Sequence, residues 1–98
     1  MSNPKIEAIV KSRYEAAFPE FKVTKVNITY TTWIIEKNDL GIPLNRKLSV
    51  SVGVKNSKGE CGIGSANVKE EYQGGGSYGQ AYMYLPSDPI IVPCENIK

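Results

Sequence analysis

Histidine is absent from the 98-residue chain, and cysteine occurs only twice, as Cys61 and Cys94. Most zinc sites need more cysteine and histidine ligands than this chain contains, and a Cys-His catalytic pair needs one residue of each type. The composition therefore excludes most zinc sites and every catalytic pair of that kind. We expect neither a bound metal nor a cofactor.

The two cysteines lie far apart in the sequence and leave two alternatives open. The N-terminus has no basic segment followed by an apolar run, which a secretory signal would require. We therefore expect a cytoplasmic protein with free thiols, because reducing compartments keep cysteines reduced. The alternative is an exported mature domain, freed of its signal, in which a disulfide joins Cys61 to Cys94.

Long apolar runs and an excess of one charge are also missing. The longest apolar stretches, around Trp33-Ile34-Ile35 and at Ile90-Ile91-Val92, are much shorter than the roughly 20 residues of a membrane-spanning helix. Twelve Lys and Arg stand against ten Asp and Glu, for a formal charge of +2. Nucleic-acid-binding domains are usually far more basic. We expect no membrane partner, and charge alone favours no other class of partner.

The chain is too short to form two separate cores, so we expect one α+β domain over residues 1–98. Its parts are a helix within 1–18, an antiparallel sheet over 21–85 and an extended tail over 86–98. The helix begins where Asn3 precedes Pro4, a pair typical of an N-cap and a first helical position. Pro19 ends it by about Phe18. The apolar stripe that we expect to cover the sheet comprises Ile6, Ile9, Val10, Tyr14 and Ala17.

The segment from Phe21 to Lys37 has the composition of a long first strand, rich in Val, Ile, Thr, Tyr and Trp. Its apolar residues change parity near Thr24-Lys25, which indicates a bulge, and a second irregularity could lie near Thr31-Thr32. We place Trp33 in the core. Turn-forming residues over 38–45 predict a loop before the next strand. That strand alternates clearly, and the side chains that should face the helix are Leu48, Val50, Val52 and Val54.

A turn at 56–59 should connect to a third strand over 60–72, and a glycine-rich break at 73–77 should precede a last strand over 78–85. In the last strand we expect one parity in the core, namely Ala81, Met83 and Leu85. The other parity, which carries Tyr78, Tyr82 and Tyr84, should be exposed on one face. Beyond it, Pro86, Pro89 and Pro93 exclude a helix or a central strand.

The glycine clusters do not match nucleotide-binding motifs. Gly74-Gly75-Gly76 lacks the Lys-Ser/Thr and the following helix of a phosphate loop, and Gly62-Ile63-Gly64 lacks the third glycine of a dinucleotide fingerprint. We interpret the second cluster as a bulge or as close packing under the helix. The carboxylates stand beside turns, strand ends or lysines, as solvated ones do. We identify no catalytic residues.

Tyrosine is the one residue type used unusually heavily, and the candidate binding residues gather around the glycine-rich break: Tyr72, Tyr78, Tyr82 and Tyr84. Tyrosines bury a large apolar area at little cost in rotamer entropy, which suits protein recognition. Cross-strand aromatic pairing on a half-exposed sheet is the alternative interpretation.

One helix followed by a curved, four-stranded antiparallel meander resembles the cystatin-like and NTF2-like architectures. The resemblance concerns topology alone. Cystatin inhibitors carry a Gln-x-Val-x-Gly loop, whereas the corresponding loop here reads Asn-Asp-Leu-Gly-Ile-Pro-Leu-Asn. Double-stranded RNA-binding domains share the helix-strand-strand-strand order over residues 3–66, but the basic closing helix that such domains need is missing.

These observations favour a non-enzymatic module that binds another protein, such as a small inhibitor, an immunity-type protein or an accessory protein. A first alternative is a small-molecule-binding or enzymatic NTF2-like domain with a pocket between helix and sheet. A second is a nucleic-acid binder, for which the mixed charges give little support. The oligomeric state is left open.

Overall fold

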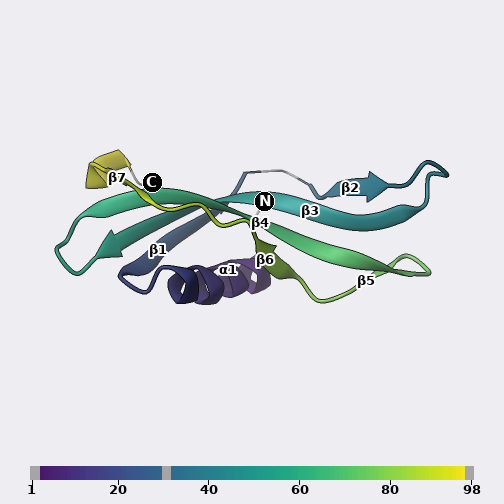
Figure 1. Ribbon diagram of the computed structural model, residues 1–98, viewed down its shortest axis with the longest axis horizontal. Helices are drawn as coiled ribbons and strands as arrows, with labels where there is room; N and C mark the ends of the chain where they lie inside the picture. Colours follow the sequence, from purple (N-terminus) through teal and green to yellow (C-terminus); the bar gives the residue numbers. More distant parts are fainter. Residues whose placement is uncertain (1–2, 30–31, 97–98) are drawn as a thin grey trace.

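The computed structural model describes residues 3–29 and 32–96 and has the expected α+β class, with one N-terminal helix and a curled antiparallel sheet (Figure 1). Tyr30 and Thr31, on which the second expected irregularity depends, lie outside the described residues. The elements are α1 (Pro4–Ala17), β1 (Phe21–Ile28), β2 (Ile34–Lys37), β3 (Pro43–Asn56), β4 (Cys61–Gly74), β5 (Ser77–Tyr78), β6 (Tyr82–Tyr84), β7 (Ile90–Val92) and the short 3-10 helix η1 (Cys94–Asn96).

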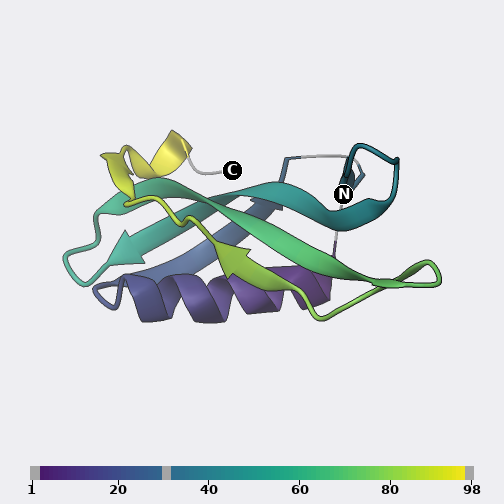
Figure 2. The ribbon, with the colours of Figure 1, turned by 45° about the vertical axis from the view of Figure 1, so that its right-hand side comes forward.

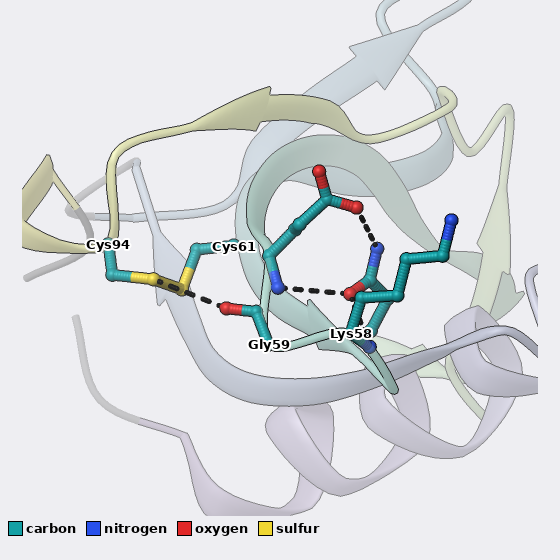
Figure 3. Close-up of a disulfide and its surroundings, with 6 residues drawn as sticks. Lys58, Gly59, Cys61 and Cys94 are labelled. Carbon is teal, nitrogen blue, oxygen red and sulfur yellow. Dashed lines mark hydrogen bonds between the residues drawn. A yellow bond between two sulfur atoms is a disulfide. The ribbon is translucent and has the colours of Figure 1, made fainter.

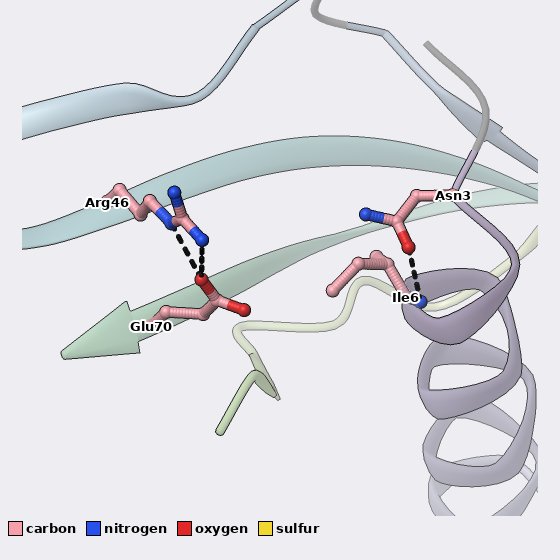
Figure 4. Close-up of polar contacts among 4 residues, drawn as sticks. All are labelled: Asn3, Ile6, Arg46 and Glu70. Carbon is pink, nitrogen blue, oxygen red and sulfur yellow. Dashed lines mark hydrogen bonds and ion pairs between the residues drawn. The ribbon is translucent and has the colours of Figure 1, made fainter. Parts of the chain in front are cut away.

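Helix α1 begins at the expected cap. The Asn3 side-chain oxygen accepts a hydrogen bond from the backbone N–H of Ile6 at 3.3 Å (Figure 4), and the carboxylate of Glu7 accepts one from the backbone N–H of Asn3 at 3.1 Å. These contacts satisfy backbone donors that a helix N-terminus otherwise leaves unpaired. The helix ends at Ala17, two residues before Pro19.

Two long strands, β3 and β4, form the spine of the sheet and pair from Asn45↔Glu71 to Lys55↔Cys61. Strands β1 and β2 both pair with β3, so the expected long first strand is divided into two. The expected last strand is likewise divided, into β5 and β6. The sheet of the described residues therefore contains more strands than the four-stranded meander expected from the sequence.

The bulge expected near Thr24-Lys25 is confirmed. The register of β1 against β3 shifts between Val23 and Lys25. Phe21 and Val23 are buried before the shift, and Val26 on the other parity packs against the core after it. The extra residue keeps apolar side chains on the helix side despite their change of parity.

The core lies between α1 and the sheet, and the expected register of β3 is confirmed. The buried side chains of β3 are Leu48, Val50, Val52 and Val54, and those of α1 are Ile6, Val10 and Tyr14. Two other core expectations hold only in part, since Ile9 and Trp33 are half-buried at its margin. Ala17 is exposed because it stands in the last turn of the helix.

Val52→Ala should lower the free energy of unfolding by about 1–3 kcal/mol, because it removes methyl groups from a fully buried side chain. Urea denaturation of both proteins gives the difference. Lys55→Ala, an exposed position on the same strand, is the control and should leave the denaturation midpoint almost unchanged. An unchanged midpoint for Val52→Ala would contradict the observed packing.

The glycines of β4 serve close packing, which confirms one of the two interpretations of their spacing. Tyr14 lies against Gly64 on the helix side of the sheet, where an added Cβ would overlap the tyrosine hydroxyl. That hydroxyl donates a hydrogen bond of 2.8 Å to the backbone carbonyl of Ser87. Burial, with the nearby charge of Asp88, raises the pKa of Tyr14 to about 12. A helix residue thus extends over Gly64 to hold the C-terminal segment at the edge of the sheet.

The C-terminal segment joins the edge of the sheet (Figure 2). Ser87 and Ser65 exchange hydrogen bonds, and β7 pairs with Cys61–Ile63 of β4. Leu85 is exposed rather than in the core, because its backbone takes a φ of 49° just before Pro86 and turns the chain out of β6.

The cysteines are joined in a disulfide (Figure 3), so the expectation of free thiols is wrong. Cys61 opens β4 and Cys94 opens η1, directly after β7. The pairing of β7 with the start of β4 brings the two Cα atoms to 5.1 Å, although 33 positions separate them in the sequence. The contact depends on the path of the C-terminal segment, which the local sequence pattern does not encode.

Candidate functional site

The sheet extends well beyond the helix at one end. The molecule is 50 Å long, whereas a helix of 14 residues spans about 21 Å. The uncovered end, here called the distal end, comprises β2, the loop at 38–42, residues 43–47 of β3, residues 69–74 of β4, and β5 (Figure 1). Side chains at this end that share the parity of the core have no helix above them.

Two of the candidate tyrosines meet at the distal end. Tyr72 and Tyr78 are directly paired across β4 and β5, and their rings stack edge to face with centroids 5.3 Å apart. The Tyr72 hydroxyl accepts a hydrogen bond of 2.9 Å from the backbone N–H of Gly76. Gly76 has a φ of 78°, a conformation that glycine adopts without strain. The tight turn therefore fixes both rings at the end of the hairpin.

Arg46, on the central strand β3, contacts the Tyr78 ring of this aromatic pair. Its guanidinium lies 4.2 Å from the ring centroid of Tyr78 and 4.5 Å from that of Trp33. The same group forms an ion pair of 2.6 Å with Glu70, its direct neighbour across β3 and β4 (Figure 4). A guanidinium stacked on aromatic rings and paired with a carboxylate adds rigidity to this surface.

The other two candidate tyrosines lie on the opposite face of the sheet. Tyr82 pairs with Lys69, and Tyr84 pairs with Asn67, both of which alternate with the buried Val68. The Tyr82 hydroxyl donates a hydrogen bond of 2.5 Å to Glu71, and this bond raises the pKa of Tyr82 to about 12.

The expectation that Tyr78, Tyr82 and Tyr84 share one face is therefore wrong. Residues 79–81 interrupt the strand, and the backbone N–H of Gly79 turns back to the carbonyl of Glu71 at 2.8 Å. The expected partial exposure is confirmed, since Tyr82 is exposed and the other two are half-buried.

Sequence reasoning missed the most exposed apolar side chains of the distal end. All belong to the β2–β3 hairpin and are, with their exposed fractions, Ile34 (42%), Ile35 (49%), Leu40 (83%), Ile42 (50%) and Leu44 (49%). The sequence feature that could have indicated these exposed side chains is the presence of Leu40 and Ile42 within a run of turn-forming residues. In the structure the Asn38 side chain accepts hydrogen bonds from the backbone N–H groups of Leu40 and Ile42, at 2.9 and 3.0 Å. Leu40 is thus presented outward by an ordered turn.

Two cations at the distal end form ion pairs with carboxylates. Besides the Arg46–Glu70 pair, Lys47 lies 3.5 Å from the carboxylate of Glu36. The side-chain hydrogen bond from Asn45, together with the charge of Lys47, lowers the pKa of Glu36. Each of these two cations therefore has a carboxylate beside it.

Side chains fill the space between the helix and the sheet. Two grooves lie along the flanks of the helix. The larger groove, about 710 Å³, runs between α1 and β6 and is lined by Ala8, Ile9, Ser12, Arg13, Gln80, Ala81 and Tyr82. Within the described residues no cluster of three or more His, Cys, Asp or Glu side chains is placed to hold a metal ion.

Among the described residues, no helix has the length and apolar character needed to cross a membrane. Comparison of the chain with protein-family models, curated proteins and solved structures finds no match.

Proposed function

We propose that this chain is a non-enzymatic module that binds another protein through its distal surface, defined as Leu40, Ile42, Leu44, Tyr72 and Tyr78. The observation that carries the proposal is the concentration of exposed aliphatic side chains in the β2–β3 hairpin. Leu44 precedes Asn45, and Tyr72 follows Glu71, the partner of Asn45 on the neighbouring strand, so the hairpin and the tyrosine pair adjoin. Exposed apolar patches of a few hundred Å² commonly mark interaction sites.

The composition of the distal surface favours a protein partner over the alternatives. Binding of nucleic acid depends on unpaired cations that neutralise phosphates, whereas two of the cations at the distal end, Arg46 and Lys47, already pair with carboxylates. A pocket between helix and sheet, as in NTF2-like domains, has no room here because Ile6, Val10 and Tyr14 fill that space. Tyrosine is enriched at protein interfaces and among the residues that contribute most to binding.

The finer topology that we propose is cystatin-like, with one domain over residues 1–98. Its support is the order of a helix followed by a curled antiparallel sheet, with the 38–42 and 74–76 loops at one end (Figure 1). Inhibitor, immunity-type and accessory roles all fit a rigid module of this kind. Protease inhibition is not proposed, because the Gln-x-Val-x-Gly motif is absent.

We also propose that the protein works outside the cytoplasm. The Cys61–Cys94 disulfide supports an exported protein, because such bonds persist in oxidising compartments and are rare in the cytosol. The cytoplasmic location expected from the sequence rested on the N-terminus, and the free thiols expected to accompany it are bonded instead.

The test compares variants of the distal surface with a matched control. Leu40→Ser and Tyr78→Ala should each weaken binding of a captured and purified partner by at least about tenfold, measured by calorimetry. Leu85→Ser is the control, because Leu85 is a similarly exposed leucine (75%) outside the distal surface, and it should bind as the wild type does. Unchanged melting temperatures would separate lost contacts from lost folding.

The pair Tyr82→Ala and Tyr84→Ala tests the opposite face in the same assay. If this double variant loses binding while Leu40→Ser and Tyr78→Ala do not, the partner uses the tyrosines on the other face of the sheet. The distal surface would then be the wrong site. If all variants bind equally, the proposal of tyrosine-mediated recognition fails as a whole.

A further inference from the structure

The outer edges of the sheet differ in how they avoid pairing with other strands. Strand β1 carries a bulge and the exposed Lys22 and Lys25, and the edge formed by β6 and β7 is interrupted by Pro86 and Pro89. Bulges, lysines and prolines are the features by which natural sheets block association at their edges. Both of these edges are therefore protected.

Strand β2 has less of this protection, because Lys37 stands only at its end, it contains no proline, and its first two residues are isoleucines. It pairs only with β3 among the described residues, so its other side is a free row of backbone donors and acceptors. The irregularity between β2 and β3 places the extra residue, Leu44, on β3 and leaves β2 extended. The exposed Ile34 and Ile35 point to opposite faces of this edge. Such an edge is a template for a further strand.

We propose that β2 pairs antiparallel with β2 of a second copy of this chain, around a two-fold axis at Ile35. In this register Ile35 of one copy lies opposite Ile35 of the other, and Ile34 lies opposite Glu36. Lys37 lies opposite Trp33, an arrangement that suits a cation and an aromatic ring. No like charges face each other, whereas an axis at Glu36 or Lys37 would place identical charges in contact.

The self-complementary sequence is what selects a second copy as the occupant. A two-fold interface needs the same strand to match itself, and Ile34-Ile35-Glu36-Lys37 does so only in registers centred on its isoleucines. A four-residue edge is smaller than a standard protein interface, so the dimer should be weak and reversible. It uses neither Leu40 nor Tyr78, and it stands or falls independently of the proposed function.

Sedimentation equilibrium over a range of protein concentrations up to millimolar tests the dimer. The wild type should move from 10.8 kDa towards twice that mass. Ile35→Lys should lower the association constant at least about tenfold, because it places two ammonium groups opposite each other. Ile90→Lys is the matched control, since Ile90 is an exposed isoleucine (71%) on β7, and it should associate as the wild type does.

Hydrogen exchange provides a second readout that does not depend on a variant. Amides of β2 should become more protected as the protein concentration rises, while those of β7 should not change. A wild type that stays monomeric, or a dimer unaffected by Ile35→Lys, overturns the proposal. Protection of β2 that appears only with an added peptide would assign the edge to a different occupant and would also overturn it.

Discussion

Reduction of the Cys61–Cys94 disulfide is expected to lower the free energy of unfolding by about 3–4 kcal/mol. The bond closes a loop across a sequence separation of 33 residues, and a cross-link of that span restricts the unfolded chain by about this amount. Beyond the hydrogen bonds of Ser87, little else holds the end of the C-terminal segment, because β7 contributes three residue pairs and Ile90 and Ile91 are exposed. We expect this segment to detach first when the bond is broken.

Urea denaturation with and without a dithiol reductant measures the effect of the disulfide. The reductant should shift the wild-type midpoint and should leave the midpoint of a Cys61→Ala, Cys94→Ala double variant where it is. That variant should already resemble the reduced wild type, because neither can form the bond. If the reductant shifts the variant equally, the loss comes from something other than the disulfide. If it shifts neither protein, the cross-link contributes nothing to stability.

Local periodicity predicted those parts of the fold that local forces determine. The cap at Asn3, the buried face of α1 and the alternation around Val52 each follow from neighbours within a few residues. The bulge after Val23 could be found for the same reason, because apolar side chains that change parity can stay on one face only if a residue is inserted between them. These features would form in much the same way in many sheets of this class.

The features that sequence reasoning missed depend on distant parts of the chain. Nothing near Tyr78 indicates that Gly79 turns back to Glu71, which separates its face from that of Tyr82. The disulfide depends on a C-terminal segment that returns to the start of β4. The turn-forming residues around Leu40 predicted a loop, but they did not indicate that its side chain is exposed at an uncovered end of the sheet. That position follows from the length of the sheet beyond the helix.

Gly64→Ala is expected to lower the free energy of unfolding by about 2–6 kcal/mol. A methyl group at this position would occupy the place of the Tyr14 hydroxyl, and its nearest backbone neighbour is the Ser87 carbonyl at 3.2 Å. Overpacking of a core typically costs about 1–3 kcal/mol. Displacement of the hydroxyl adds about 1–3 kcal/mol, because the hydrogen bond to Ser87 is lost in a buried position.

The control for this prediction is Gly79→Ala, where the added methyl group would meet the flexible end of the Gln73 side chain instead of a buried ring. Its cost should be below about 0.5 kcal/mol, as for surface substitutions in general. A double-mutant cycle with Tyr14→Phe then identifies the cause. Because Tyr14→Phe removes the atom nearest to the new methyl group, Gly64→Ala should cost clearly less in that background, as measured by urea denaturation. Strictly additive costs would mean that the tyrosine hydroxyl is not what requires glycine at position 64.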